Sequence, residues 1–353
     1  IFKKLAFHQV MLKAFDIKNS KGRRDMQESL IIHELDIFLS DYFKIIQSKA
    51  YRRLNFKTQV LCHPENAHIR TRGVHTNEVT AIAGTISEQL GLNTHLCLAI
   101  SAGHDLGHTP YGHMAETIFS ELGKKPFNHH IFSVVVAQEI ERKAQGLNLS
   151  FETLEGILLH SRKDGEMTID LSKPMEYNVV MYADKIAYTF SDLNDTIRDG
   201  KLSEEKIPKY VDEFGKNQRE RNNSCIKALI NESREKGYVS FSEGHTAQIF
   251  KEFRDFMYKE VYFKIDWSLH EEVLRRAYNY FSRMLKQKKI DVDPIIALAL
   301  LTDRDADTLA KEFINNTSDP SFDKIKNFGA FEILPYLSGK NIDYSNPKLD
   351  WGK

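Results

Sequence analysis

The chain has 353 residues, of which 41% are hydrophobic and 28% charged, so it can bury a sizeable globular core. This composition excludes a collagen-like, low-complexity or wholly disordered chain. The 49 basic and 49 acidic residues cancel, so net charge gives no sign of a nucleic-acid-binding protein, although it leaves a local basic patch open.

The three cysteines are far apart and form neither a disulfide framework nor a zinc ribbon, so we expect a reducing, cytoplasmic location. No apolar run approaches the roughly 18 residues of a membrane span, and we expect no membrane partner. The chain begins at Ile1 with no visible signal peptide, and we expect a short N-terminal piece to precede it.

Helical periodicity dominates the chain, and neither strand alternation nor an internal repeat is apparent, so we predict an all-α fold. Thr109 is predicted to cap a helix with Pro110 in its first turn, whereas Pro208 disfavours helix around it. The predicted helices span 75–90, 95–108, 109–122, 129–144, 150–160, 176–199, 203–214, 219–236, 243–262, 269–288 and 294–315, followed by an irregular tail with short elements over 318–353.

Histidines are concentrated in one part of the chain. Nine of the 14 lie between His63 and His130, where an even distribution would place about three. Imidazole is the commonest protein metal ligand and titrates near neutral pH. Any one of these histidines can be an ordinary core or surface residue, but the cluster predicts a metal or acid-base site.

Four residues within and beyond this cluster suggest a metal site: His75, the pair His104-Asp105, and Asp184. The His-Asp pair ends a strongly apolar predicted helix, where polar side chains need partners or a ligand. Two imidazoles and two carboxylates from three helices can enclose one divalent cation and leave positions open for water and phosphate oxygens. Such ligands accept Mn, Mg, Fe, Co or Ni. The alternative is a buried His-Asp pair that satisfies itself.

These motifs and their surroundings resemble the HD-domain phosphohydrolases. Within them, the chain is most similar to the deoxynucleoside triphosphate (dNTP) triphosphohydrolases, which include the bacterial dGTPases and a vertebrate relative that carries a SAM domain. The resemblance implies an HD helical core over 48–200, preceded by a helical or irregular segment 1–47 and followed by a helical extension 201–353 packed on that core. The resembling segments are 48–60, 70–76, 104–113, 127–130, 146–150, 182–188 and 301–304.

The resemblance also implies a role for individual residues. It makes His113 and Glu116 a catalytic dyad. The implied metal ligands are His75, His104, Asp105 and Asp184. The implied substrate contacts are His108 and His129 to the phosphates, Arg72 and Lys185 to the triphosphate charge, Tyr188 to the sugar, Gln59 and Asp192 to the 3′-hydroxyl, and Val60 to the 2′ side.

Helix geometry supports two parts of this assignment independently. His113 and Glu116 are three residues apart, so one helix face presents both, and the carboxylate can orient the imidazole. Asp184, Tyr188 and Asp192 recur every four residues, so a metal ligand, a sugar platform and a hydroxyl acceptor follow one another along one stripe.

Simpler structural roles remain open for several of these residues. Asp192 and Asp195 can form a solvated ladder with Arg198. Tyr188 can be a plain core tyrosine, and Arg72 can form a structural salt bridge.

The chain departs from the family pattern at three places. His130 stands where the family often has Asn, which leaves the role of that position open. Asp305 follows Arg304 where a tyrosine is common, so the C-terminal part of the pocket can differ. An arginine expected near Asp41-Tyr42 is missing.

The resemblance implies hydrolysis of dNTPs, with dGTP one candidate, to deoxynucleoside and tripolyphosphate by water attack on the α-phosphorus, with one divalent metal ion per site. It also implies a homo-oligomer, hexameric or tetrameric, and raises dNTP regulation and binding of single-stranded DNA. One alternative is another HD-domain phosphohydrolase, acting on nucleoside monophosphates or signalling nucleotides. Another is a non-catalytic nucleotide sensor or nucleic-acid binder that uses basic runs such as 286–289, which otherwise form a solvated helix end.

Overall fold

The computed structural model describes residues 11–25, 28, 36–62, 66–161, 167–315 and 319–349. Every regular element in these ranges is a helix, apart from one isolated antiparallel bridge between Thr58 and Thr71. The all-α prediction is confirmed. None of the described helices combines the length and hydropathy needed to cross a bilayer.

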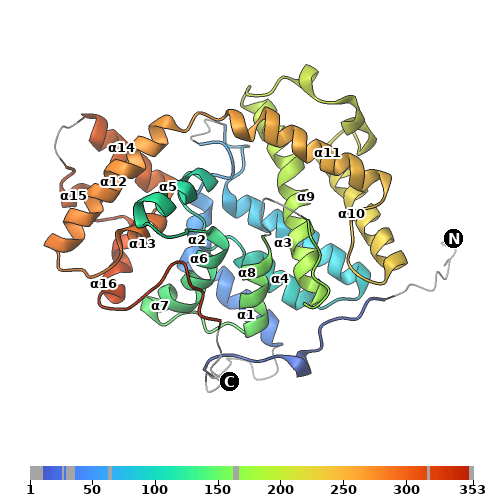
Figure 1. Ribbon diagram of the computed structural model, residues 1–353, viewed down its shortest axis with the longest axis horizontal. Coiled ribbons are helices and arrows are strands. Elements are labelled where there is room, and N and C mark those ends of the chain that lie inside the picture. The colour runs from blue at the N-terminus through green and yellow to red at the C-terminus, as the bar shows by residue number, and fades with distance from the viewer. Residues whose placement is uncertain are drawn as a thin grey trace.

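A bundle of helices forms the centre of the molecule (Figure 1). The long helix α9 (Met175–Arg198) packs against α3 (Arg72–Leu90) and α4 (Thr94–Gly103). Helix α4 also packs against α1 (Ile37–Ile46) and α8 (Phe151–Leu159). This arrangement brings the start of α3, the end of α4 and the middle of α9 together.

Local sequence signals explain where several of these helices begin and end. Thr71, Asn93 and Ser150 each accept a backbone N–H at the start of α3, α4 and α8, as N-caps do. Gly91 ends α3 in the left-handed region at φ 70°, where a glycine carries no steric penalty.

The predicted helix start at Thr109 and Pro110 is wrong, and so is the predicted continuation of α4 to residue 108. Helix α4 ends at Gly103, and α5 (His113–Gly123) begins at His113. The hydroxyl of Thr109 donates to the carbonyl of Gly112 at 2.7 Å, and so closes a turn instead of capping a helix. Residues 104–112 therefore form a connecting loop, which carries the predicted site residues His104, Asp105 and His108.

The predicted helix over 129–144 is interrupted. It divides into α6 (His129–Val135), a π-helical turn (Val136–Ile140) and α7 (Glu141–Ala144). Arg142 and Lys143 have positive φ values of 51° and 58°, which no continuous α-helix allows.

Two further predicted helices are also wrong. The stretch 203–214 holds two short 3₁₀ turns, Glu204–Lys206 and Lys209–Glu213, on either side of Pro208. The stretch 294–315 divides into α13 (Pro294–Ala299) and α14 (Asp303–Asn315).

The helices after residue 200 pack on two sides of the central bundle. Helices α10 (Gln218–Lys236) and α11 (His245–Glu260) pack against α9, and α12 (Ser268–Gln287) and α13 pack against α5. The basic run 286–289 lies exposed at the end of α12. The boundaries at 48 and 201 stay a prediction. The remaining helices are α2 (Lys49–Arg53), α15 (Phe322–Ile325) and α16 (Leu334–Leu337), and the remaining 3₁₀ turns are Ile17–Asn19, Leu54–Phe56, Tyr262–Lys264 and Gly329–Glu332.

Candidate active site

The four predicted metal ligands converge. His75 lies in α3, His104 and Asp105 follow the last residue of α4, and Asp184 lies in α9. The Nε2 atom of His75 is 3.0 Å from Oδ1 of Asp184, and Nε2 of His104 is 3.2 Å from Asp105 and 3.9 Å from Asp184. Ligand atoms of His75, His104 and Asp184 all lie within 4.8 Å of one another.

The hydrogen bonds of this group suit a metal site. Nδ1 of His104 lies 2.6 Å from the carbonyl of Ser101, to which it donates. That bond leaves the lone pair of Nε2 for a ligand, as a bonded second ring nitrogen does in metal sites. Within the described residues, Nε2 of His104 is buried and makes no hydrogen bond, although a carboxylate oxygen of Asp105 lies 3.2 Å away.

The charges of the group also call for a cation. Although burial lowers it, the charges of Asp105 and Asp184 raise the pKa of His104 to about 9. Burial raises the pKa of Asp184, but the hydrogen bond and charge of His75 outweigh it and lower that pKa. The carboxylates thus favour positive charge between the two imidazoles, which a divalent cation would supply.

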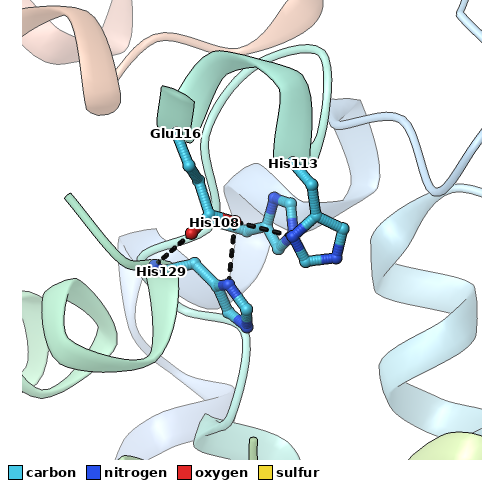
Figure 2. A group of neighbouring side chains, drawn as sticks. All are labelled: His108, His113, Glu116 and His129. Carbon is cyan, nitrogen blue, oxygen red and sulfur yellow. Dashed lines mark hydrogen bonds and ion pairs between the residues drawn. The ribbon is translucent and has the colours of Figure 1, made fainter. Parts of the chain in front are cut away.

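A second group of side chains, drawn in Figure 2, lies next to the first, since Nε2 of His129 is 3.9 Å from Oδ1 of Asp105. His113 and Glu116 belong to α5, His129 begins α6, and His108 lies in the loop between α4 and α5. Nδ1 of His113 lies 2.6 Å, and Nδ1 of His129 2.9 Å, from the same Oε1 atom of Glu116. The predicted pairing of His113 with Glu116 is therefore present in the structure, and Glu116 also orients His129.

A cavity of about 2220 Å³ opens beside both groups. Of the predicted site residues, only His104 and His108 are outside its lining, and both are buried. The predicted residues in its lining are Gln59, Val60, Arg72, His75, Asp105, His113, Glu116, His129, Asp184, Lys185, Tyr188 and Asp192. The cavity exceeds the roughly 300–1,000 Å³ of an ordinary small-molecule pocket.

The stripe predicted on α9 faces this cavity. Asp184, Tyr188 and Asp192 all line it. The hydroxyl of Tyr188 accepts hydrogen bonds from Arg254 at 3.0 and 3.2 Å, and the hydroxyl of Tyr262 donates to Asp192 at 2.8 Å. Helix α11 and the turn after it thus supply the second side of the predicted sugar site.

Asp192 and Asp195 differ in their surroundings. Asp195 binds Arg198 at 2.8 Å, as the alternative foresaw, and it also binds Arg70 at 2.7 Å. It is only 3% exposed, however, so this pairing is not the solvated ladder of that alternative. Asp192 is only 2% exposed and takes no part in that ladder. Burial, with the nearby charge of Asp195, raises the pKa of Asp192 to about 8.

Arg72 forms the salt bridge that the alternative foresaw. Its Nη1 donates to Asp105 at 2.7 Å, and its other nitrogens donate to the carbonyls of Thr58 and Gln59. Arg72 therefore fixes one predicted metal ligand, and it still lines the cavity.

Three residues in the site had no assignment from the sequence. Arg254 and Tyr262 come from a segment without a distinctive motif. The only sequence signal for them is an arginine that recurs with aromatic residues on one predicted amphipathic helix. His160, at the end of α8, lies with its ring centroid 5.0 Å from that of His104 and lines the cavity. The histidine enrichment before residue 130 did not extend to it.

The departures from the family pattern have structural counterparts. Asp305 accepts hydrogen bonds from the amide and hydroxyl of Thr302 at the start of α14 and is not in the cavity lining. Asp41 forms an ion pair with Arg23 at 2.7 Å, so an arginine reaches this position from an earlier segment. His130 lines the cavity, and burial lowers its pKa to about 4.

Comparison with known proteins agrees with this geometry. The HD domain family matches residues 72–189, which include all four predicted metal ligands. A deoxyguanosinetriphosphate triphosphohydrolase-like protein of Clostridium tetani is 38% identical over 254 residues, which cover 69% of this chain and 73% of that protein. A protein of the same name from Desulfatibacillum aliphaticivorans is 38% identical over 250 residues, which cover 69% of this chain and 71% of that protein. Another, from Caldanaerobacter subterraneus, is 38% identical over 269 residues, which cover 75% of this chain and 77% of that protein.

The helical core and its histidine-aspartate site are those of an HD-domain protein. The chain belongs to the deoxyguanosinetriphosphate triphosphohydrolase-like family of HD-domain phosphohydrolases.

Proposed function

We propose that this protein hydrolyses dNTPs to the deoxynucleoside and tripolyphosphate by attack of water on the α-phosphorus. The observation that carries this proposal is the meeting of three features at one cavity. They are the His75–His104–Asp184 group, the His113–Glu116 pair and the tyrosine-bearing face of α9.

His75, His104, Asp105 and Asp184 would hold one divalent cation, Mn, Mg, Fe, Co or Ni. When bound, this cation would polarise a phosphoryl oxygen and make water more acidic. Arg72 keeps Asp105 in place through its bond at 2.7 Å. The positive charges of Arg72 and Lys185 at the cavity wall would stabilise the negative charge that develops on the phosphates.

His113 is the proposed proton donor to the leaving 5′-oxygen, which is a strong base as an alkoxide. Its Nδ1 is held by Glu116, so Nε2 is the atom left to carry the transferred proton. His108 and His129 adjoin it, with ring centroids 4.9 and 5.1 Å from that of His113, and are proposed to contact the phosphates.

The deoxyribose is proposed to lie on Tyr188, whose hydroxyl is held by Arg254. Asp192 and Gln59 would hydrogen-bond the 3′-hydroxyl; Oε1 of Gln59 is buried without a hydrogen-bond partner among the described residues. Val60 and Tyr188 would leave no room and no partner for a 2′-hydroxyl, which is how ribonucleotides would be rejected.

Assembly and regulation are proposed on the family resemblance alone. The chain is proposed to act in the cytoplasm as a homo-oligomer, a hexamer or a tetramer. Activation by dNTPs and binding of single-stranded DNA are further proposals, each to be tested separately.

The test is product analysis. Protein loaded with each candidate metal is incubated with every dNTP and NTP, and nucleoside and polyphosphate products are separated by chromatography. We expect deoxynucleoside and intact tripolyphosphate from dNTPs and no turnover of NTPs. Release of a nucleoside monophosphate and pyrophosphate, or turnover only of monophosphates or signalling nucleotides, would indicate another HD phosphohydrolase. Nucleotide binding without turnover under every metal would indicate a sensor.

A further inference from the structure

Three imidazole rings surround one carboxylate beside the proposed metal site (Figure 2). The ring centroids of His108, His113 and His129 are 4.9, 4.8 and 5.1 Å apart, so they form a nearly equilateral triangle. Each of these residues and Glu116 offers a ligand atom within 4.8 Å of all the others. We call these four residues the His108 cluster.

This spacing matches that of a metal bound by three histidines. Zn–N distances of about 2.0–2.1 Å in a tetrahedral site place three imidazole centroids about 5 Å apart. The ligand atoms themselves would need to close to about 3.4 Å. His113 can make this adjustment, because its side chain is 71% exposed and so has room to rotate.

A buried ring nitrogen provides an independent sign of a missing ligand. His108 is fully buried, and its Nε2 atom has no hydrogen-bond partner in the part of the chain that is described. Leaving such a polar atom unpaired is costly, so an atom that binds it would be favoured. Glu116 adds a carboxylate whose side chain is only 14% exposed.

The His108 cluster shares no residue with the first group of ligands. It is nevertheless adjacent, because Nε2 of His129 lies 3.9 Å from Oδ1 of Asp105. The donor sets also differ. The cluster has three imidazoles and one carboxylate, which suits Zn²⁺ better than Mg²⁺.

We propose that the His108 cluster is a second metal site, which binds Zn²⁺ or a similar transition-metal ion when no nucleotide occupies the cavity. Coordination through Nδ1 of His113 and His129 requires that the protons which these nitrogens direct toward Glu116 move to Nε2 of the same ring or to water, because the coordinating nitrogen must be unprotonated. The ion then occupies both members of the proposed proton-donating pair. Zinc beyond one equivalent therefore inhibits turnover. This inhibition rests on the proposed function, whereas the binding of zinc to the cluster does not.

The test counts metal ions per chain by equilibrium dialysis against Zn²⁺ and by the visible absorption of Co²⁺, which distinguishes tetrahedral sites. We expect two equivalents in the unaltered protein. His113→Ala should bind one, and Asp184→Ala should retain the one in the cluster. His245→Ala is the matched control, because His245 is 70% exposed and pairs with Glu213 at 2.8 Å away from the site; it should bind two.

A single equivalent in the unaltered protein would overturn the proposal, as would an unchanged count in both His113→Ala and Glu116→Gln. Thermal unfolding of each variant shows whether a lost equivalent reflects a lost fold. With the first site filled by Mn²⁺, a second equivalent of Zn²⁺ should lower the rate at subsaturating dNTP at least about tenfold. Saturating dNTP should relieve this inhibition, because the ion and the nucleotide exclude each other. Absence of dNTP turnover under every metal would refute the proposed function and leave the metal count as it is.

Discussion

His113 and Glu116 are joined by the bond on which proton transfer depends in our proposal. We predict that His113→Ala lowers kcat by about 10²–10⁴-fold, because the leaving oxygen loses its proton donor. KM should change little, and the variant should still bind Mn²⁺ at the proposed site formed by His75, His104, Asp105 and Asp184. Steady-state kinetics with metal analysis checks this. Glu116→Gln should cause a smaller loss, since it removes the orienting charge but not the imidazole. An unchanged kcat in His113→Ala would exclude this residue from the chemistry.

Asp192 predicts a pH dependence of stability. Its pKa is about 8 in the fold, against 3.8 when exposed, because burial disfavours the charged carboxylate. The folded state therefore binds more protons than the unfolded state between about pH 4 and pH 8, so this residue lowers stability as pH rises through that window. The resulting loss in the free energy of unfolding is absent below pH 4 and constant above about pH 8.

The matched variant is Asp192→Asn, which keeps the shape without the charge. We expect it to raise Tm at pH 8 and to leave Tm almost unchanged at pH 4.5. Each kcal/mol corresponds to about 1–2 °C for a chain of this length. Calorimetry across this range checks the result. An equal shift at both pH values would show that Asp192 does not titrate as described.

Sequence patterns predicted the contacts of site residues within one helix but not those between distant segments. The i, i+3 and i, i+4 spacings predicted that Glu116 faces His113 and that Asp184, Tyr188 and Asp192 share one face, because helix geometry is local. The pairing of Tyr188 with Arg254 and of Asp192 with Tyr262 joins residues more than sixty positions apart. No local periodicity encodes such contacts.

At the scale of the elements, Gly107 shows why the loop 104–112 can approach α6 so closely. A Cβ atom there would lie 2.3 Å from the amide nitrogen of Ser133 and 2.4 Å from the carbonyl carbon of Phe132, and these backbone atoms cannot yield easily. Gly107→Ala should therefore destabilise the protein by about 3 kcal/mol, at the upper end of overpacking costs. Denaturant unfolding measures this.

Gly329→Ala is the control for this substitution. Nothing among the described residues lies within 4 Å of a Cβ atom there, so the change should stay within about 0.5 kcal/mol. Comparable stability of the two variants would show that the close approach of the loop to α6 is not a constraint.

Helix boundaries were predicted well where caps are local and poorly where distant contacts decide. Proline at 110 suggested a first helical turn, yet the amide of Tyr111 donates instead to Asp303 at 3.1 Å. That carboxylate also accepts from the amide of Thr58 at 2.8 Å. A bond from a residue almost two hundred positions away delays the start of α5, and no local signal reveals it.

For the whole molecule, contacts across residue 200 predict a single cooperative unit. The buried ammonium of Lys57 donates to the carbonyl of His108 and, at 3.1 Å, to the carbonyl of Ala299. Helices α10 and α11, which follow residue 200, also pack on α9, which precedes it. We expect one unfolding transition in which calorimetric and van't Hoff enthalpies agree. A fragment of residues 1–200 should fail to fold, and two separated transitions would instead support independent domains at the predicted boundary.

In our proposal, residues of α3, of the end of α4 and of α9 hold one cation at the wall of a cavity that is large enough for a nucleotide. Anomalous diffraction from crystals grown with Mn²⁺ and a non-hydrolysable dNTP analogue tests it directly. We expect a peak within about 2.5 Å of nitrogen atoms of His75 and His104 and oxygen atoms of Asp105 and Asp184, beside the α-phosphate. The absence of a Mn²⁺ peak among these four side chains, or an analogue whose α-phosphate lies away from them, would contradict the proposal.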